Sequence, residues 1–423
     1  MKFLKQKKSL VFFLLITFLF SGCSLKNKES NKNDVYDYLK ENKKVIDEQD
    51  LNNFSNLSIM DSDLIDKEIF LTGEWPGVKA NYIMNMNFLK YFKEKADIKY
   101  YLCDIPYSYA HFLNIFLQTG NLDLLSAIYE PLYGSKIWSK DDYQSWIELY
   151  NYNNTLPEYK KISIVGIGLE TRADVSFSYM NMVTSNKTAP SEIRNLLSEM
   201  KAIWSKSSNQ SEIKEACEKM KKDIELRQDV YKNFLGEDFL GFKLVNDNLL
   251  NTIEAYGLWE KSISKYHEFI SQKVYENFKQ QYSVLERGKY YGNFPISQVF
   301  QNEQDNVRWL AAAINEDMLS LKNKVLSIAY AYDNCKYMIK GTKYTTSSLS
   351  TFDEILNNLQ GIATEKYTLF KLNNKNSPFS KQLIWLISGS DIVPDSKSTT
   401  DYYQYLLVIK NSEASEPLTK IEK

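Results

Sequence analysis

Short apolar runs bounded by turn residues constrain the fold of this chain more than any other feature of its sequence. Five such runs occur, at residues 69–72, 100–104, 162–167, 325–331 and 405–409. Their length and their borders are typical of buried strands. Segments with helical periodicity lie between them, as at residues 82–93 and 111–118. Because strands that alternate with helices form parallel sheets, we predict an α/β fold with a mostly parallel sheet covered by helices on both faces.

A long helical segment interrupts this alternation between about residues 190 and 286. Apolar residues recur there with helical spacing, in stripes such as the one that contains Ile193, Leu197 and Met200. No strand pattern appears in the segment, so we predict a helical subdomain inserted into the α/β domain. The whole domain is predicted to span residues 51–415, and a charged tail follows at 416–423.

The first residues of the chain have the pattern of a bacterial lipoprotein signal. A lysine-rich start precedes an apolar run at residues 10–20, and small residues lie directly before Cys23. The run is shorter than the roughly 20 residues that a spanning helix needs, so an uncleaved membrane helix is the less favoured alternative. We therefore predict a signal peptide at 1–22, acyl chains on Cys23 and a flexible tether at 23–50. The protein would then be anchored by lipid to the extracytoplasmic face of the cell membrane.

Composition excludes several classes of protein. The chain is 43% hydrophobic and 14% aromatic, which is more than a disordered chain contains, and its net charge of −1 gives no basis for binding nucleic acid. Besides Cys23 the cysteines are Cys103, Cys217 and Cys335, an odd number without paired spacing. We interpret them as buried thiols, with a disulfide between Cys103 and Cys335 as the alternative.

Acidic residues lie at or close to the ends of three of the predicted strands. Asp104 is the last residue of the second predicted strand, and Glu74 and Glu170 lie two and three residues beyond the ends of the first and third. The carboxyl ends of parallel strands share one edge of a sheet, and open α/β sheets bind their ligands there. We therefore expect the three carboxylates to meet in one cleft. The alternatives are that Glu74 and Asp104 cap helices and that Glu170 pairs with Arg172.

Three more residues are candidates for the same cleft. Arg308 is predicted to lie on a helix two turns before Asn315, on nearly the same face, where it could separate the acids or bind an anion. Asp333 ends the fourth predicted strand, and His111 lies one helical turn past the cleft, after the second. A structural, partly buried role is the favoured interpretation of His111. The numerous aromatic residues are expected to serve mainly in the core rather than to line a ligand site.

At this point the chain resembles the erythromycin-esterase-like family of hydrolases over most of residues 65 to 415. The family motif Gly-Glu-x-His-Gly, in a version one residue longer, is matched by Gly73, Glu74 and Gly77, and the acid after the second strand is matched by Asp104. Arg308 and Asn315 keep the family's spacing. The long helical segment and a closing strand at 403–411 correspond as well. The resemblance implies that the chain has the α/β fold of these esterases and a cleft that acts on ester bonds.

The histidines that the resemblance calls for are missing. Pro76 occupies the place of the first, Gln298 and Pro295 lie in a segment that often carries another, and residues 330–333 have none. The whole chain contains two histidines, His111 and His267. A general base that works near neutral pH is most easily a histidine, because free Asp and Glu have pKa values of roughly 4. The missing histidines favour a protein that keeps the hydrolase fold but has lost its catalytic activity.

Two hypotheses follow. In the first, the chain is a membrane-anchored surface lipoprotein of degenerate hydrolase fold that binds a small molecule, an envelope component or another protein. In the second, it remains a hydrolase of an ester or lactone, with Glu74 or Asp104 as the base and Arg308 as the charge stabiliser. No cofactor or metal is predicted. In a variant of the second hypothesis, acids such as Glu74 and Asp104 hold Mg²⁺ or Ca²⁺.

Overall fold

Residues 34–205, 209–304, 306–341, 344–354, 358–388 and 397–419 are described by the computed structural model. The predicted signal peptide and Cys23 lie outside these residues. Among the helices that are described, none is long and apolar enough to cross a bilayer.

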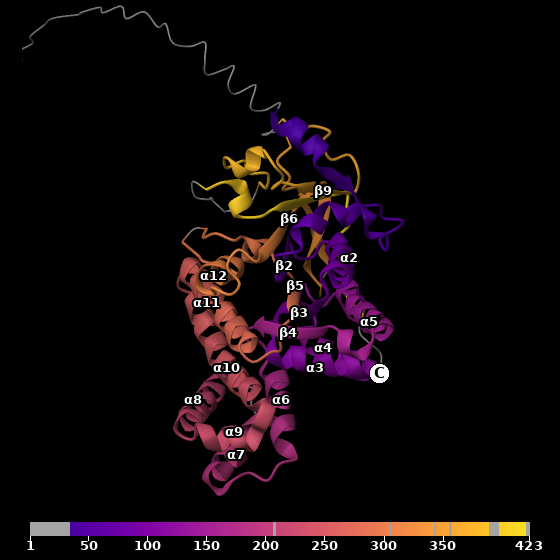
Figure 1. The fold of residues 1–423 in the computed structure, drawn as a ribbon. Helices are drawn as coiled ribbons and strands as arrows, with labels where there is room; N and C mark the ends of the chain where they lie inside the picture. Colours follow the sequence, from indigo (N-terminus) through magenta and orange to yellow (C-terminus); the bar gives the residue numbers. More distant parts are fainter. Residues whose placement is uncertain are drawn as a thin grey trace, which may run out of the picture.

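An eight-stranded sheet forms the centre of the molecule (Figure 1). In their order across the sheet its strands are β1 (Lys43–Val45), β9 (Tyr367–Lys371), β10 (Tyr405–Lys410), β6 (Val325–Asp333), β2 (Ile69–Glu74), β5 (Lys289–Pro295), β3 (Ile98–Pro106) and β4 (Ser163–Gly168). The pairs from β10 to β4 are parallel, while β9 and β1 are antiparallel to their neighbours. A separate hairpin consists of β7 (Cys335–Lys340) and β8 (Thr345–Leu349).

Helices surround the sheet and form a separate lobe. The α-helices are residues 34–41, α2 (Lys79–Ala96), α3 (Tyr107–Thr119), α4 (Leu122–Tyr129), α5 (Lys140–Thr155), α6 (Ala173–Ser185), α7 (Ser191–Trp204), α8 (Gln210–Leu226), α9 (Gln228–Leu235), α10 (Phe239–Trp259), α11 (Ile263–Tyr282) and α12 (Leu310–Asp317). Short 3₁₀ helices are η1 (Phe54–Asp63), η2 (Glu130–Leu132), η3 (Glu158–Lys160), η4 (Gly236–Asp238), η5 (Ile296–Val299), η6 (Pro378–Ser380) and η7 (Thr399–Asp401).

The sheet is buried on both faces because neighbouring residues of a strand point to opposite sides. In β2, Phe70 belongs to the core formed with α2, whereas Leu71 belongs to the core formed with α11 and α12. Figure 1 shows α2 and α5 on one side of the sheet and α11 and α12 on the other. The α/β class and its parallel sheet are thus as predicted, and the five predicted strands are β2, β3, β4, β6 and β10.

The helical insertion has a core of its own. Helices α6 to α10 pack around buried apolar residues such as Met180, Leu197 and Phe242. The lobe extends away from the sheet in Figure 1, and α11 returns from it to lie against β4. This return places α11 beside the carboxyl end of the sheet, where it forms one wall of the cleft described below.

The predicted tether is longer than the structure allows. The predicted tether reaches residue 50, but residues 34–41 are helical with Leu39 fully buried, and β1 pairs with β9. Burial of apolar side chains thus joins the second half of this segment to the domain.

Strand β5 was not predicted, because its Gly292 and Asn293 are turn residues in most contexts. A Cβ at Gly292 would lie 2.4 Å from the ring of Phe294, so close packing requires the glycine.

Side-chain amides cover the exposed edge of β4, the last strand of the sheet. The amide of Asn114 on α3 donates to the carbonyl of Ile164 (2.9 Å) and accepts from its N–H (2.8 Å). From α11, Gln281 donates to the carbonyl of Gly166 (2.7 Å) and Asn277 to that of Ile167 (3.0 Å). Unpaired edge groups invite pairing with another chain, so these amides protect the strand.

The variant Asn114→Ala is expected to lose about 1–2 kcal/mol of stability, because it leaves a backbone donor and acceptor of Ile164 without partners. It should also self-associate more than the wild type, since part of the strand edge is uncovered. Urea unfolding and light scattering measure the two effects. Gln118→Ala, one turn further along α3 at an exposed position, is the matched control and should change neither.

Candidate functional site

A cavity of about 340 Å³ opens at the carboxyl ends of β3 and β4. Its walls come from the start of α3, from α4 and α5, from the loop after β4 and from α11. The lining residues are Asp104, Ile105, Pro106, Tyr109, Leu113, Ile128, Tyr129, Leu132, Ile137, Asp142, Trp146, Gly168, Leu169, Thr171, Tyr266, Ile270 and Val274. These walls combine two carboxylates with aromatic and aliphatic side chains, and none of them carries a basic group.

Two aspartates supply the charge of the cavity. Asp104 lies within β3, in the irregular stretch between the paired residues Cys103 and Pro106, and its side chain is exposed. Asp142 lies in the first turn of α5, where it is half-buried and accepts a hydrogen bond from the hydroxyl of Tyr129. Because protein atoms surround the concave site, desolvation raises the pKa of Asp104 to about 6 and that of Asp142 to about 6.

The C-terminal segment holds the start of α5 in place. Ser139 caps the helix by accepting a hydrogen bond from the N–H of Asp142 (3.1 Å), and its hydroxyl lies 2.6 Å from that of Ser415. The hydroxyl of Ser415 also donates to Asp141 (2.9 Å), and the N–H of Lys140 donates to the carbonyl of Glu416 (2.8 Å). Residues distant in sequence thus position Asp142.

Glu74 ends β2 and is close enough to Asp142 to feel its charge, but it is not among the residues that line the cavity, contrary to expectation. The amide of Asn293 on the neighbouring strand β5 donates to one of its oxygens (2.8 Å), and the hydroxyl of Thr72 donates to the same Asn293 (2.8 Å). Desolvation raises the pKa of Glu74 to about 7, and the negative charge of Asp142 adds to the shift despite the opposing hydrogen bond from Asn293. At neutral pH, Glu74 therefore exists in both protonation states.

A polar network continues below Glu74 in the core. The hydroxyl of Tyr291 lies 3.0 Å from that of Thr72 and donates to Asn85 (2.9 Å), and Asn85 in turn donates to the hydroxyl of Tyr101 (2.7 Å). All these groups are buried and share hydrogen bonds with one another. The network fixes the strand ends that position Glu74.

The loop after β2 turns away from the cavity. The N–H of Trp75 donates to the hydroxyl of Tyr332 (2.9 Å), its carbonyl accepts from Asn81 (2.8 Å), and its ring contacts that of Tyr337 on the hairpin. Gly77 has φ +96°, and a Cβ there would lie 2.7 Å from the carbonyl oxygen of Met338. Trp75 and Pro76 are therefore not among the residues that line the cavity.

The structure gives Glu170 a partner set different from the one expected. Its carboxylate accepts hydrogen bonds from the N–H (3.0 Å) and hydroxyl (2.5 Å) of Ser108 and from the hydroxyl of Ser176 (2.7 Å). Arg172 instead pairs with Asp174 (3.0 Å). Glu170 is 1% exposed and ties the start of α3 to α6, so it supports the walls of the cavity without facing it.

Arg308 lies outside the cleft. Helix α12 begins at Leu310, so Arg308 precedes the helix instead of sharing a face with Asn315. Its guanidinium is exposed and pairs with Glu316 (3.2 Å) and Asp317 (3.0 Å). The side chain of Asn315 accepts from the N–H of Asn323 (2.6 Å). The extended backbone at Trp309 causes this difference by breaking the helical phase.

Asp333 and the two histidines also have other surroundings. Asp333 pairs with Lys410 (2.8 Å) across β6 and β10. The ring of His111 contacts that of Tyr179 on α6 at 4.9 Å between centroids, and His267 contacts Trp309 at 5.5 Å. Burial lowers the pKa of both imidazoles. Neither histidine lines the cavity, and Cys103, Cys217 and Cys335 are free, buried thiols.

The sequence interpretation missed Asp142, Tyr129, Trp146 and Asn293. Asp142 had one visible signal, since Ser139 followed three residues later by an acid is typical of a helix start. Tyr129 and Trp146 lie on the apolar stripes of α4 and α5, where an aromatic residue looks like any core residue. Their convergence depends on how these two helices pack.

Gln298, in a segment where the resemblance often implies a histidine, is buried and structural. It is 4% exposed, and its side-chain oxygen accepts a hydrogen bond from the N–H of Leu310 (3.2 Å) at the start of α12. The N-cap residue of α12, Trp309, makes no side-chain capping hydrogen bond, so the side chain of Gln298 caps the start of this helix instead.

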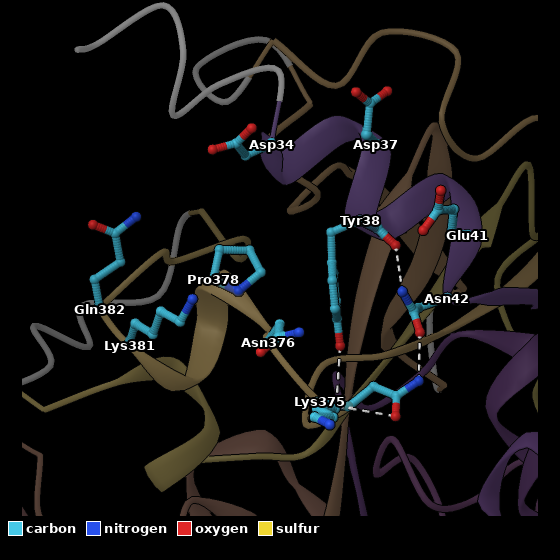
Figure 2. Close-up of a pocket in the computed structure, with 11 residues that line it drawn as sticks. Asp34, Asp37, Tyr38, Glu41, Asn42, Lys375, Asn376, Pro378, Lys381 and Gln382 are labelled. Atoms are coloured by element: carbon cyan, nitrogen blue, oxygen red, sulfur yellow. Dashed lines mark hydrogen bonds between the residues drawn. The ribbon is translucent and has the colours of Figure 1, made fainter.

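A second pocket, of about 750 Å³, lies at the other edge of the sheet between helix 34–41 and residues 374–382. Asn42 donates to the carbonyl of Tyr38 (2.8 Å; Figure 2) and accepts a hydrogen bond from the side chain of Asn374 (2.7 Å). Surface side chains form this pocket, and no parallel strand ends in it. The cavity at the ends of β3 and β4 is the better candidate because strand ends and helix starts converge there.

The acids do not form a metal site. In the described part of the chain, no group of three or more His, Cys, Asp or Glu side chains is arranged to hold an ion. Glu170 and Asp333 are bound by their own partners, away from Asp104. The arrangement can instead attract a cation, accept protons near neutral pH and enclose an apolar group.

Comparison with known proteins supports the architecture. No protein-family model and no curated protein sequence matches the chain. A succinoglycan biosynthesis protein has a TM-score of 0.68 at 14% identity, over 92% of this chain and 99% of its own. A Bacillus cereus protein has a TM-score of 0.68 at 15% identity, over 91% and 99%. A histidine-to-asparagine mutant of the erythromycin esterase EreC, in its open conformation, has a TM-score of 0.67 at 11% identity, over 87% and 96%. The chain therefore has the erythromycin-esterase-like fold, an α/β sheet with a helical insertion.

Proposed function

We propose that this protein is a membrane-anchored surface lipoprotein that uses the hydrolase fold to bind a ligand without cleaving it. The observation that carries the proposal is the lining of the cavity, in which carboxylates and aromatic rings occur without an imidazole or a guanidinium. Hydrolysis of an ester needs a base and a group that stabilises the developing negative charge. Arg308, the expected stabiliser, is exposed and paired with acids elsewhere.

The shape of the site also suits binding. The cavity has about the volume of a small ligand pocket, and its apolar walls come from elements that are well packed. Asp104 on β3 and Asp142 at the start of α5 supply orientation, while Tyr129 and Trp146 supply contact area. The lipoprotein signal in the sequence would keep this site at the cell surface, in contact with molecules outside the membrane.

Incubation of the purified protein with a panel of esters and lactones, including a macrolide, tests the absence of turnover. We expect no product above the rate without protein at any pH from 5 to 8. Product formation by the wild type that is lost in Glu74→Gln would overturn the proposal. Asp174→Asn, a surface acid on α6, is the control for nonspecific effects of removing a charge.

A carboxylate-based hydrolase is the second candidate, and one observation favours it. Glu74 has a pKa raised to about 7 by burial, so part of it is a free base at neutral pH. Under this alternative the rate would rise with pH and level off above the pKa of Glu74. The turnover experiment separates the two candidates directly.

A further inference from the structure

We infer that the mouth of the cavity binds the sugar rings of an uncharged glycan. The rings stack on an aromatic strip, formed by Tyr256, Trp259 and Tyr266, and their hydroxyls donate to Asp104. The inference rests on the proposed function and names the class of ligand that this protein would bind. The position of the strip, its exposure and the carboxylate beside it carry the argument.

The aromatic strip continues one wall of the cavity outward. On α11, Tyr266, Ile270 and Val274 lie one turn apart and line the cavity. The ring of Tyr266 contacts that of Trp259 at the end of α10, with 4.9 Å between the centroids and 83° between the planes. Tyr256 lies one turn before Trp259 on α10. The strip therefore leads from the inside of the cavity to the surface of the protein.

The end of α10 is held beside the mouth of the cavity. The hydroxyl of Thr252 donates to the carbonyl of Glu170 (2.9 Å) in the loop after β4. The next residue of that loop, Thr171, lines the cavity. Tyr256 lies one turn after Thr252 on the same side of α10. The hydrogen bond therefore positions the outer part of the strip next to the loop at the mouth.

The rings of the strip are open to solvent, whereas most large aromatic side chains of a folded protein are buried. Trp259 is 56% exposed, and it is the one exposed residue among the seven tryptophans, all of which lie in the described part of the chain. Tyr256 is 55% exposed and Tyr266 is half-buried. Neighbouring exposed rings that adjoin a cavity are typical of a binding site.

A carboxylate lies beside the strip. The side chain of Asp104 is exposed and belongs to the lining of the cavity. Desolvation raises the pKa of Tyr266, and Tyr256 and Asp104 add to the shift, so both groups are close enough to affect its hydroxyl. A carboxylate accepts hydrogen bonds from the hydroxyls of a sugar, while the C–H groups on the face of a sugar ring pack against an aromatic ring. The mouth thus offers a partner to each part of a sugar.

Other occupants match the mouth of the cavity less well. An acyl chain would cover the aromatic rings but would desolvate Asp104 without giving it a hydrogen bond. An anionic ligand would be repelled by the same carboxylate, and the lining of the cavity contains no lysine, arginine or histidine to offset that repulsion. An uncharged sugar avoids both costs.

Isothermal titration calorimetry of the full chain with β-linked oligosaccharides tests the inference. The ligands are cellotetraose and tetra-N-acetylchitotetraose, whose equatorial hydroxyls leave the faces of each ring free to stack. Glucose and N-acetylglucosamine are their single-ring counterparts. Because the strip extends beyond the cavity, each tetrasaccharide should bind about 10-fold more tightly than its monosaccharide, as additional stacking contacts provide.

Variants locate the effect of chain length on the strip. Trp259→Ala should weaken tetrasaccharide binding about 5-fold and leave the monosaccharide within about 2-fold, because only the outer part of the strip is removed. Trp259→Phe keeps an aromatic face and should lose less. Asp104→Ala should weaken both ligands, because the carboxylate lines the cavity itself. Tyr159→Ala removes an aromatic residue that is 81% exposed and does not line the cavity, and it should bind like the wild type.

The outcomes separate the inference from the proposed function. The inference is wrong if neither tetrasaccharide binds the wild type, or if each binds no more tightly than its monosaccharide. It also fails if vesicles of phosphatidylglycerol bind the protein through Trp259 and the oligosaccharides do not, since the strip would then be a membrane contact. Turnover of esters, measured separately, overturns the proposed function instead. The length series uses the wild type, so its result does not depend on the folding of a variant.

Discussion

Replacing Glu170 with alanine is expected to lower the free energy of unfolding by about 3 kcal/mol, because a buried anchor is lost and its donors are left without a partner. Helix α3 begins after Pro106, which provides no side-chain cap, and the carboxylate of Glu170 instead accepts from the N–H of Ser108 in its first turn. A negative charge at a helix start is favourable, so the carboxylate replaces the missing cap. The hydroxyl of Ser176 ties the same carboxylate to α6.

Urea unfolding followed by circular dichroism measures this effect. Glu170→Gln should lose less stability than Glu170→Ala, because an amide oxygen still accepts from Ser108 and the amide nitrogen can donate to a hydroxyl. Asp174→Ala removes an acid from an exposed ion pair nearby and should cost less than about 1 kcal/mol. If the alanine variants at positions 170 and 174 lost equal stability, the anchoring role of Glu170 would be wrong.

Stability is expected to fall as pH rises from about 4 to 8, and Glu74→Gln should recover about 2 kcal/mol of it at pH 8. Desolvation raises the pKa of Glu74 from 4.5 to about 7, and raises the pKa of Asp142 from 3.8 to about 6. Between the unfolded and folded pKa values the native state binds more protons than the unfolded state. Raising the pH through this window therefore favours unfolding.

Asp63 is a control because its contribution to stability should depend on pH in the opposite direction to that of Glu74. Burial by itself would raise its pKa, but hydrogen bonds from Asn373, Tyr405 and Lys371 outweigh burial and hold its pKa below the usual range. Its contribution to stability is present at neutral pH and is lost as pH falls through the folded pKa, so Asp63→Asn should destabilise more at pH 7 than at pH 3. Urea midpoints across this pH range test both variants. A gain for Glu74→Gln that did not depend on pH would show that ionisation of Glu74 is not the cause.

Much of the scaffold was accessible from the sequence because it follows local patterns. Apolar runs bounded by turns predicted the strands that became β2, β3, β4, β6 and β10. Strand β5 escaped because Gly292 and Asn293 look like a turn, yet Gly292 is needed for close packing against Phe294 and Asn293 for the contact with Glu74. Its role depends on neighbours that are distant in the chain.

The sequence likewise predicted some residues of the candidate site and missed the surroundings of others. The positions of Glu74 and Asp104 at strand ends followed from the order of elements, because parallel strands bring their carboxyl ends to one edge. The partners of Glu170 and Arg308 could not be predicted, since Ser108 and Ser176 approach Glu170 only after α3 and α6 pack, and the chain at Trp309 breaks the helical phase.

The sequence by itself determined the class of the fold, the strand ends that carry acids and the scarcity of imidazoles. Only the tertiary structure decided that Asp142, rather than Glu170 or Arg308, joins Asp104 in a cavity with aromatic walls. The physical reason is that periodicity is a local property of burial, whereas a site depends on the packing of helices such as α5 and α11 from distant parts of the chain. Whether an acid faces a partner or a cavity follows from that packing, and with it the pKa and the chemistry of the group.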